Sequence, residues 1–139
     1  MDEPAVTIVP IGHVESPLID CAAAPKQGHE GAPPAWLVFE PAVHDGLRDL
    51  RAGEEVLVLT WLHRADRTTL RVHPRDDENT PLRGVFSTRS QDRPNPVGIH
   101  RVRIVEIDGP GRIAVHDLEA IDGTPIIDVK PVLDPERER

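Results

Sequence analysis

The fold is decided by the stretch GIHRVRIVEIDGPGRIAVHDLEAI, residues 98–121, which predicts one long β-hairpin. Between residues 98 and 107, apolar and charged side chains alternate, as they do in a strand with one buried face. Residues 108–111 are a turn sequence, and residues 113–121 are the predicted returning strand. A hairpin of this length favours a mainly β fold.

Further strands are predicted on both sides of this hairpin. They cover residues 5–11, which Gly12 closes, 36–39, 56–63, 69–73 and 126–132. The almost continuously apolar run 56–63 suits a strand buried on both faces, and Pro131 indicates an edge or a strand end. Residues 41–50 have a helical spacing of apolar side chains. We therefore predict a small single-domain β-barrel, antiparallel or mixed, with one or two short helices.

The composition agrees with many short segments. A chain of 139 residues that is 38% hydrophobic holds one modest core, which excludes two stacked catalytic domains. With no Tyr, two Phe and two Trp, the core must be filled by Val, Ile, Leu and Ala. Fifteen Pro and ten Gly limit long helices, because Pro costs roughly 3 kcal/mol and Gly about 1 kcal/mol inside a helix.

The net charge of −8 speaks against a general nucleic-acid coat protein. The charge is uneven, however. Residues 64–103 hold nine of the 16 basic and five of the 24 acidic side chains, so this segment is net +4 and the remainder net −12. Such a segment can attract phosphate locally; the alternative is that its arginines are solvated and lie near the acidic residues 76–78.

Cysteine and targeting signals point to an intracellular, cytoplasmic protein. Cys21 is the single cysteine, which excludes an internal disulfide and a cysteine cluster for zinc. It has no basic neighbour to activate it, so we predict an inert thiol. The N-terminus is acidic, and the longest apolar run, residues 56–62, is far shorter than the roughly 20 residues of a spanning helix.

A proline-rich stretch, GVFSTRSQDRPNPVG at residues 84–98, carries the strongest chemical signal. Pro94 and Pro96 fix two backbone φ angles, so this loop is predicted to be preorganised. Arg89 and Arg93 lie four residues apart, and guanidinium groups suit carboxylate or phosphate ligands. The alternative is a rigid turn whose arginines pair with nearby acidic side chains.

The stretch DGTPIIDVKP, residues 122–131, is the second candidate. It begins as an ordinary turn sequence, whereas Asp128 and Lys130 share one face of the following strand. These two side chains can position a polar ligand or pair with each other. Lys26 and Gln27, in a long loop without helical or strand pattern, are a third candidate.

Seven histidines raise the question of a metal, but their spacing matches no zinc motif, and no metal is predicted. His63, at the end of a predicted strand, is the candidate for a functional histidine, with a structural role as the alternative. His100 and His116 are predicted to be surface or hairpin residues. The sequence contains no Rossmann fingerprint, phosphate-binding glycine loop or nucleophile elbow.

Together these motifs resemble the TsaA-like (TrmO) family of S-adenosylmethionine-dependent methyltransferases. The resemblance covers residues 6–133 and rests on FSTRSQDRPNPVG followed by DGTPIIDVKP, with IGHVESP near the N-terminus, PKQ in the long loop and WLH after it as support. It implies that residues 1–139 form a single TsaA-like β-barrel domain without a C-terminal accessory domain. It also implies a homodimer that binds S-adenosyl-L-methionine at its interface.

The candidate site residues follow from the same resemblance. We hypothesise that Asp128, or a neighbouring acceptor, orients the nucleophilic amine of the substrate, with Lys130 beside it as a catalytic residue. The residues that the resemblance implies around the cofactor are Pro25, Lys26, Gln27, His63, Phe86, Thr88, Arg89, Arg93, Asn95, Gly98, Ile99, Asp122, Gly123 and Thr124.

The resemblance implies N6-methylation of threonylcarbamoyladenosine next to the anticodon of tRNA. Two alternatives stay open: a methyltransferase with the same cofactor site that acts on a small molecule, and a non-catalytic module that binds S-adenosylmethionine. The scarcity of aromatic residues counts against base stacking as the main means of holding RNA.

Overall fold

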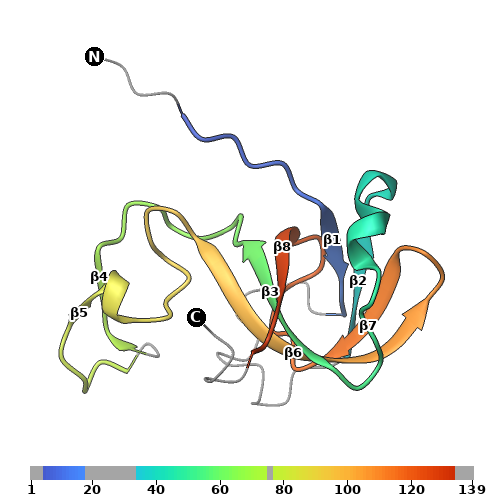
Figure 1. The fold of residues 1–139 in the computed structure, drawn as a ribbon. Helices are drawn as coiled ribbons and strands as arrows, with labels where there is room; N and C mark the ends of the chain where they lie inside the picture. Colours follow the sequence, from blue (N-terminus) through green and yellow to red (C-terminus); the bar gives the residue numbers. More distant parts are fainter. Residues whose placement is uncertain (1–4, 18–33, 75–76, 134–139) are drawn as a thin grey trace.

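The computed structural model describes residues 5–17, 34–74 and 77–133. Within these ranges six strands close into a barrel in the order β1-β2-β7-β6-β3-β8, and each neighbouring pair is antiparallel (Figure 1). The strands are β1 (Gly12–Glu15), β2 (Ala35–Phe39), β3 (Glu55–Trp61), β6 (Val97–Asp108), β7 (Arg112–His116) and β8 (Pro125–Pro131). The prediction of a mainly β fold is confirmed.

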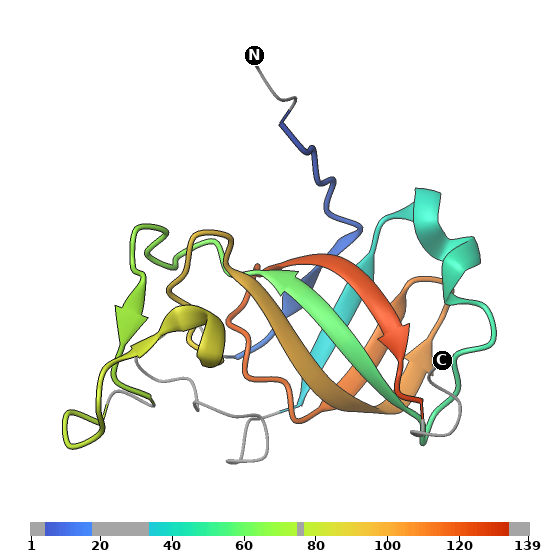
Figure 2. The ribbon, with the colours of Figure 1, turned by 60° about the vertical axis from the view of Figure 1, so that its left-hand side comes forward.

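A separate two-stranded sheet, β4 (Arg71–Val72) with β5 (Arg83–Gly84), lies beside the barrel (Figure 2). The 3-10 helix η5 (Val85–Ser87) follows it directly. Residues 88–96 then lead the chain back to β6. The proline-rich motif is therefore the connection between the small sheet and the barrel.

The hairpin of β6 and β7 confirms most of the prediction for residues 98–121. Every second residue of β6 from 98 to 104 is buried, and the residues between them are exposed. The returning strand is shorter than predicted, however, because β7 ends at His116. Asp117 follows with φ of 74°, a left-handed backbone conformation that interrupts the strand.

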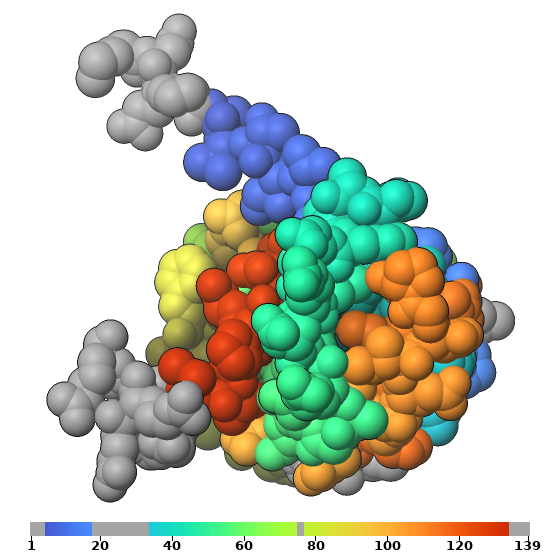
Figure 3. Space-filling view, turned by 45° about the vertical axis from the view of Figure 1, so that its right-hand side comes forward, coloured from blue at the N-terminus to red at the C-terminus, as the bar shows by residue number. Residues whose placement is uncertain are grey.

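The prediction of a first strand over residues 5–11 is wrong. β1 begins at Gly12, and residues 5–10 are exposed and extend away from the barrel (Figure 3). Pro10 has no N–H group to donate to a strand ladder. Gly12 does not close a strand but lies inside the barrel wall, where an added Cβ would be 2.3 Å from the carbonyl oxygen of Val38. Only glycine allows β1 to approach β2 this closely.

The predicted helix over residues 41–50 is the 3-10 helix η3 (Pro41–Leu47). It ends early because Asp49 takes a φ of 77°, which no helix continues. Val43, Leu47 and Leu50 nevertheless pack against the barrel core, as their spacing indicates. In the ranges given above, no helix has the length and apolar character needed to cross a membrane.

Three other strands match their predictions unequally. β3 lies within residues 55–61 and buries alternate side chains, so the prediction of burial on both faces is wrong. The alternating run 69–73 forms only the two residues of β4. β8 ends at Pro131, as that proline predicts.

The barrel interior is filled by aliphatic side chains, as the scarcity of aromatic residues predicts. Phe39 is the one aromatic residue in this core as far as the structure describes it. Burying one Val, Leu or Ile fully contributes about 1.5–3 kcal/mol. The buried cluster comprises Val14, Ala35, Leu37, Phe39, Val56, Val58, Val102, Ile104, Ile113, Val115, Leu118, Ala120 and Ile126.

Candidate functional site

A cavity of about 660 Å³ lies where one end of the barrel meets the small β4–β5 sheet. Its walls come from the chain that follows β3, from the small sheet, from the proline-rich loop with the first residues of β6, and from residues 119–121 and Thr124 before β8. The volume lies within the range of about 300–1,000 Å³ that small-molecule sites have. The two sequence motifs therefore contribute to one cavity.

Arg93 holds the proline-rich loop together from inside. Its guanidinium group donates hydrogen bonds to the carbonyl oxygens of Val85, Thr88 and Ser90, at 3.1 Å to the last two. A planar fork with five N–H donors can serve several carbonyls at once. The sequence left open whether this arginine binds a ligand or pairs with acidic side chains; the structure shows that it binds backbone carbonyls.

Arg67 fixes the same loop from outside. Its Nε atom donates to the carbonyl oxygen of Pro94 at 2.7 Å, and Nη2 donates to Oδ1 of Asn95 at 3.0 Å. The guanidinium group also lies over the ring of Trp61, 5.0 Å from the ring centre. Two arginines thus brace the loop, which agrees with the prediction that it is preorganised.

The turn before Arg67 is ordered by Asp66. The Asp66 carboxylate accepts hydrogen bonds from the backbone N–H of Thr68 at 2.8 Å and from its hydroxyl at 2.7 Å. These two hydrogen bonds lower the pKa of Asp66, because they favour the ionised carboxylate. The backbone N–H of Asp66 in turn donates to Asp92 in the proline-rich loop at 2.8 Å.

Arg89, unlike Arg93 and Arg67, does not bind other described residues through its side chain. Its side chain lines the cavity, and it makes no hydrogen bond or ion pair with any residue that the structure describes. A guanidinium group that faces a cavity without a protein partner is available to a carboxylate or phosphate ligand. The clamped loop therefore presents one free cation to the cavity.

His100 is a site residue that the sequence reasoning missed. Of the prediction of a surface or hairpin residue, the surface position is wrong: His100 lies on the hairpin strand β6, but it is only 4% exposed and lines the cavity. Nδ1 lies 2.7 Å from Oε1 of Glu119, and Nε2 lies 2.7 Å from Oγ1 of the buried Thr60. The signal was present in the sequence: His100 has the same parity along β6 as the core residues Val102 and Ile104.

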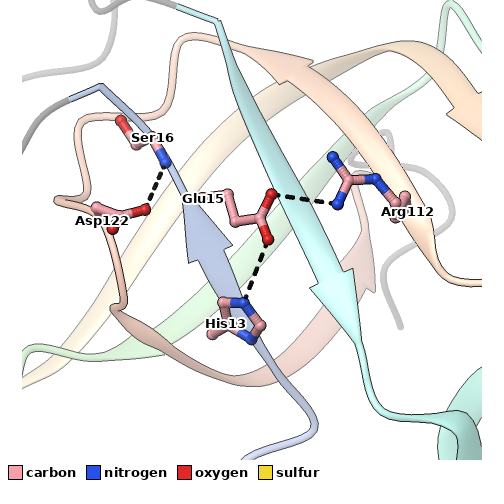
Figure 4. Close-up of polar contacts among 5 residues, drawn as sticks. All are labelled: His13, Glu15, Ser16, Arg112 and Asp122. Carbon is pink, nitrogen blue, oxygen red and sulfur yellow. Dashed lines mark hydrogen bonds and ion pairs between the residues drawn. The ribbon is translucent and has the colours of Figure 1, made fainter.

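The DGTP turn is held against β1 by its own polar groups. Oδ1 of Asp122 accepts a hydrogen bond from the backbone N–H of Ser16 at 3.0 Å (Figure 4). Gly123, with φ of 83°, donates its N–H to the carbonyl oxygen of Val14 at 2.7 Å. Only Thr124 of this turn lines the cavity, where its hydroxyl donates to the carbonyl oxygen of Ile121 at 2.7 Å.

In the barrel wall beside this turn, a second arginine pairs with a carboxylate and stacks on a tryptophan. Arg112 lies 3.1 Å from Oε1 of Glu15, whose other carboxylate oxygen lies 3.7 Å from His13 (Figure 4). The same guanidinium group lies over the ring of Trp36, 4.8 Å from its centre. The charge of Arg112 is therefore met by a carboxylate.

The structure brings only part of the predicted cofactor set to the cavity. The residues that line it are His63, Thr88, Arg89, Arg93, Gly98, Ile99 and Thr124. The predicted residues outside its wall are Phe86, Asn95, Asp122 and Gly123. Pro25, Lys26 and Gln27 lie outside the described residues, so their role stays a prediction.

The predicted catalytic pair does not reach this cavity within one chain. Nζ of Lys130 lies 3.3 Å from Oδ2 of Asp128, so the two side chains pair with each other. A register shift between Leu59 and Thr60 aligns Asp128 with Leu59, on the outer face of the barrel. Across the described residues, no group of three or more potential ligands gathers as a metal ion would require.

Comparison with known proteins places the chain among a group with a common description. Residues 13–135 match the model of the tRNA-methyltransferase O N-terminal domain. A protein of Archaeoglobus fulgidus named "S-adenosyl-L-methionine-binding protein" is 40% identical over 121 residues, which are 87% of this chain and 85% of that protein.

Longer proteins share the same region. A second Archaeoglobus fulgidus protein, named "Probable S-adenosyl-L-methionine-binding protein", is also 40% identical over 121 residues, but these are only 32% of its length. The crystal structure of TrmO from Pseudomonas aeruginosa superposes with a TM-score of 0.76 at 26% identity, over 98% of this chain and 60% of that one. The chain thus spans about a third and three fifths of the lengths of these two proteins.

Proposed function

The chain belongs to the family of the tRNA-methyltransferase O N-terminal domain, and from this premise we propose that it is an S-adenosyl-L-methionine-dependent methyltransferase. The cofactor site is the cavity between the barrel end and the proline-rich loop. The observation that carries this proposal is Arg89, a guanidinium group without a described protein partner on a loop that two other arginines hold in place.

The donor set of the cavity fits the chemistry of this cofactor. Arg89 suits the carboxylate of its amino-acid part, since a guanidinium fork can donate two parallel hydrogen bonds to two oxygens. Leu62, Val97 and Ile99 offer apolar surface for a nucleoside, and Ala120 and Ile121 line the same cavity. When bound, the cofactor supplies an activated methyl group on a sulfonium ion.

The chain's own contribution is to hold donor and acceptor in line and to keep water out. The clamped loop serves this purpose, because Arg93 and Arg67 fix the backbone that carries Arg89. Asp128 and Lys130 do not line the cavity of their own chain, so a catalytic role for them requires a second copy to bring them there. We accordingly include in the proposal a homodimer whose interface closes the cavity.

Exposed apolar side chains near the cavity support that dimer. Phe86 is 80% exposed on η5, and Ile99, in the cavity wall, is 40% exposed. Sedimentation at micromolar concentration should give twice the mass of one chain. A species of about 15.4 kDa would contradict a shared site.

Calorimetry with S-adenosylmethionine tests the site. Arg89→Gln should weaken binding roughly tenfold or more, because a charge-assisted hydrogen bond contributes about 1.5–3 kcal/mol. Arg101→Gln is the matched control, since Arg101 lies on the barrel wall, where it pairs with Glu55 at 3.0 Å. No binding by the wild-type chain at millimolar cofactor would refute the proposal.

The substrate that we propose is threonylcarbamoyladenosine of tRNA, methylated at N6, which would place the protein in the cytoplasm. The family description supports tRNA, and basic residues around the cavity suit a phosphate backbone. Incubation with methyl-labelled cofactor and bulk tRNA should yield a labelled nucleoside on digestion.

A binding-only module is the second candidate. It is favoured by the relatives named for S-adenosylmethionine binding and by the mutual pairing of Asp128 and Lys130. Cofactor binding without transfer of label to tRNA or to metabolites would support it. Label in small metabolites alone would identify a small-molecule methyltransferase.

A further inference from the structure

We propose that Glu119 is a specificity-determining residue that contacts the positive charge of the bound cofactor. This inference rests on the proposed binding of S-adenosylmethionine in the cavity. Glu119 lies outside the predicted site. The proposal also gives a role to the buried His100, which neither the proline-rich loop nor the DGTP turn accounts for.

The carboxylate of Glu119 is held in one orientation. Its Oε1 atom lies 2.7 Å from Nδ1 of His100, and the side chains of Glu119 and His100 are 21% and 4% exposed. His100 is fixed from its other side by Oγ1 of Thr60, at 2.7 Å from Nε2. Thr60 is fully buried. A side chain fixed by a buried histidine loses little further freedom when a ligand binds.

The charged side chains of the cavity wall indicate which ligand groups Glu119 can contact. Among the described residues, Glu119 and Asp92 are the acidic side chains of the cavity wall. Asp92 belongs to the proline-rich loop, and its Oδ1 atom accepts the backbone N–H of Asp66, in the turn after β3. The side chains of two arginines of the cavity wall, Arg89 on the loop and Arg83 on β5, have no hydrogen bond or ion pair with a described residue. His100 occupies Oε1 of Glu119, whereas Oε2 has no hydrogen bond with a described residue, so the ligand should bring positive charge to Oε2 and negative charge to Arg89.

S-adenosylmethionine carries two such positive charges, the sulfonium and the α-ammonium group. Three ligands separate them by calorimetry. S-adenosylhomocysteine keeps the ammonium group but has a neutral sulfur, and 5′-methylthioadenosine has neither charge. Glu119→Gln preserves the shape of the side chain and removes its negative charge.

We expect Glu119→Gln to lower the affinity for S-adenosylmethionine at least tenfold and to leave the affinity for methylthioadenosine unchanged. If the contact is with the sulfonium, S-adenosylhomocysteine keeps its affinity; if it is with the ammonium group, S-adenosylhomocysteine weakens as well. Equal changes for all three ligands, or none, would overturn the assignment. Glu106→Gln, an exposed carboxylate of β6 outside the cavity wall, is the matched control.

The two proposals fail in different ways. A wild-type chain that binds no S-adenosylmethionine refutes the proposed function itself. A wild-type chain that binds it, while Glu119→Gln binds all three ligands as the wild type does, refutes only the role of Glu119. Thermal unfolding of each variant shows whether a loss of affinity comes from a loss of folded protein.

The positioning role of His100 is tested through Thr60. Thr60→Val removes the hydroxyl that holds Nε2 but keeps the side-chain volume. It should lower the affinity for S-adenosylmethionine about threefold and leave the affinity for methylthioadenosine unchanged. Thr60→Ser should restore the affinity. A loss shared by all ligands, or one that serine does not restore, would show that Thr60 only supports the fold.

Discussion

The two Arg–Trp stacks of the molecule have similar geometry, but the arginines differ in their polar partners. In the barrel wall, Arg112 lies over Trp36 and its charge is met by the carboxylate of Glu15. At the cavity, Arg67 lies over Trp61, and its partners are a carbonyl and an amide oxygen of the loop. Neutral partners fix geometry without cancelling charge. The charge of Arg112 in the barrel wall is therefore neutralised, whereas the charge of Arg67 beside the loop is not.

The largest effect is expected where the barrel touches the cavity. In Gly98→Ala, the new Cβ would lie 2.5 Å from Oγ1 of Thr60 and 2.8 Å from Nε2 of His100. We expect a loss of about 1–3 kcal/mol in the free energy of unfolding, because the site is overpacked, together with loss of cofactor binding. Chemical denaturation and calorimetry measure the two effects.

Gly84→Ala is the control for this substitution, since an added Cβ at Gly84 meets no atom within 4 Å and its φ is −60°. It should change neither quantity. A Gly98→Ala variant that binds the cofactor normally would show that the Thr60–His100 contact is dispensable.

Arg93→Lys should cost a similar amount of stability, but it should weaken cofactor binding rather than abolish it. An ammonium group cannot serve the carbonyls of Val85, Thr88 and Ser90 together, and partly buried acceptors left without a donor cost about 1–3 kcal/mol at most. Urea unfolding should show this loss, and the affinity for S-adenosylmethionine should fall with it. Arg101→Lys, at an exposed ion pair of the barrel wall, should cost clearly less stability than Arg93→Lys and leave the affinity unchanged. Equal costs would remove the distinction between loop and wall.

The two stacks can be compared directly through Arg67→Lys and Arg112→Lys. Each loses the planar stacking of a guanidinium group on a tryptophan ring, so both unfolding free energies should drop. Only Arg67→Lys should weaken the cofactor, since it releases Pro94 and Asn95. If Arg112→Lys weakened the cofactor equally, the wall would take part in the site.

The smallest effect concerns two exposed carboxylates with a lowered pKa. Hydrogen bonds from Thr68 lower the pKa of Asp66 in the loop region, and the hydrogen bond from Arg101 lowers that of Glu55 in the wall. Because each folded-state pKa lies below the unfolded one, each group stabilises the fold above the unfolded pKa. This contribution disappears as the pH falls through the folded-state pKa.

Urea midpoints of wild type, Asp66→Asn and Glu55→Gln between pH 7 and pH 3 measure these contributions. Each variant should be slightly less stable than wild type at pH 7, and the difference should shrink as the pH falls toward 3. A difference that grows toward acid would reverse the sign that the hydrogen bonds imply.

The sequence predicts the elements whose pattern is local. The alternation around Val102 and Ile104 identifies β6, and Pro131 marks the end of β8. Gly12 misleads, because its purpose is a close approach to Val38, more than twenty residues away along the chain. A glycine that permits packing and a glycine that ends a strand look the same in a sequence.

The site was predictable only in part for the same reason. Arg89 and Arg93 belong to one motif, yet their different partners are visible only when the loop is folded. Glu119 follows a break in the hairpin at Asp117, so no regular pattern connects it with His100. The register shift in β3 and β8 likewise turns Asp128 away from the cavity.

A crystal structure of the chain with S-adenosylhomocysteine tests the central claim most directly. We predict that the ligand lies in the cavity between the barrel end and the proline-rich loop, with its carboxylate on Arg89 and its nucleoside beside Ile99. A ligand bound on the outer face of β8, against Asp128 and Lys130 and away from Arg89, would contradict the account.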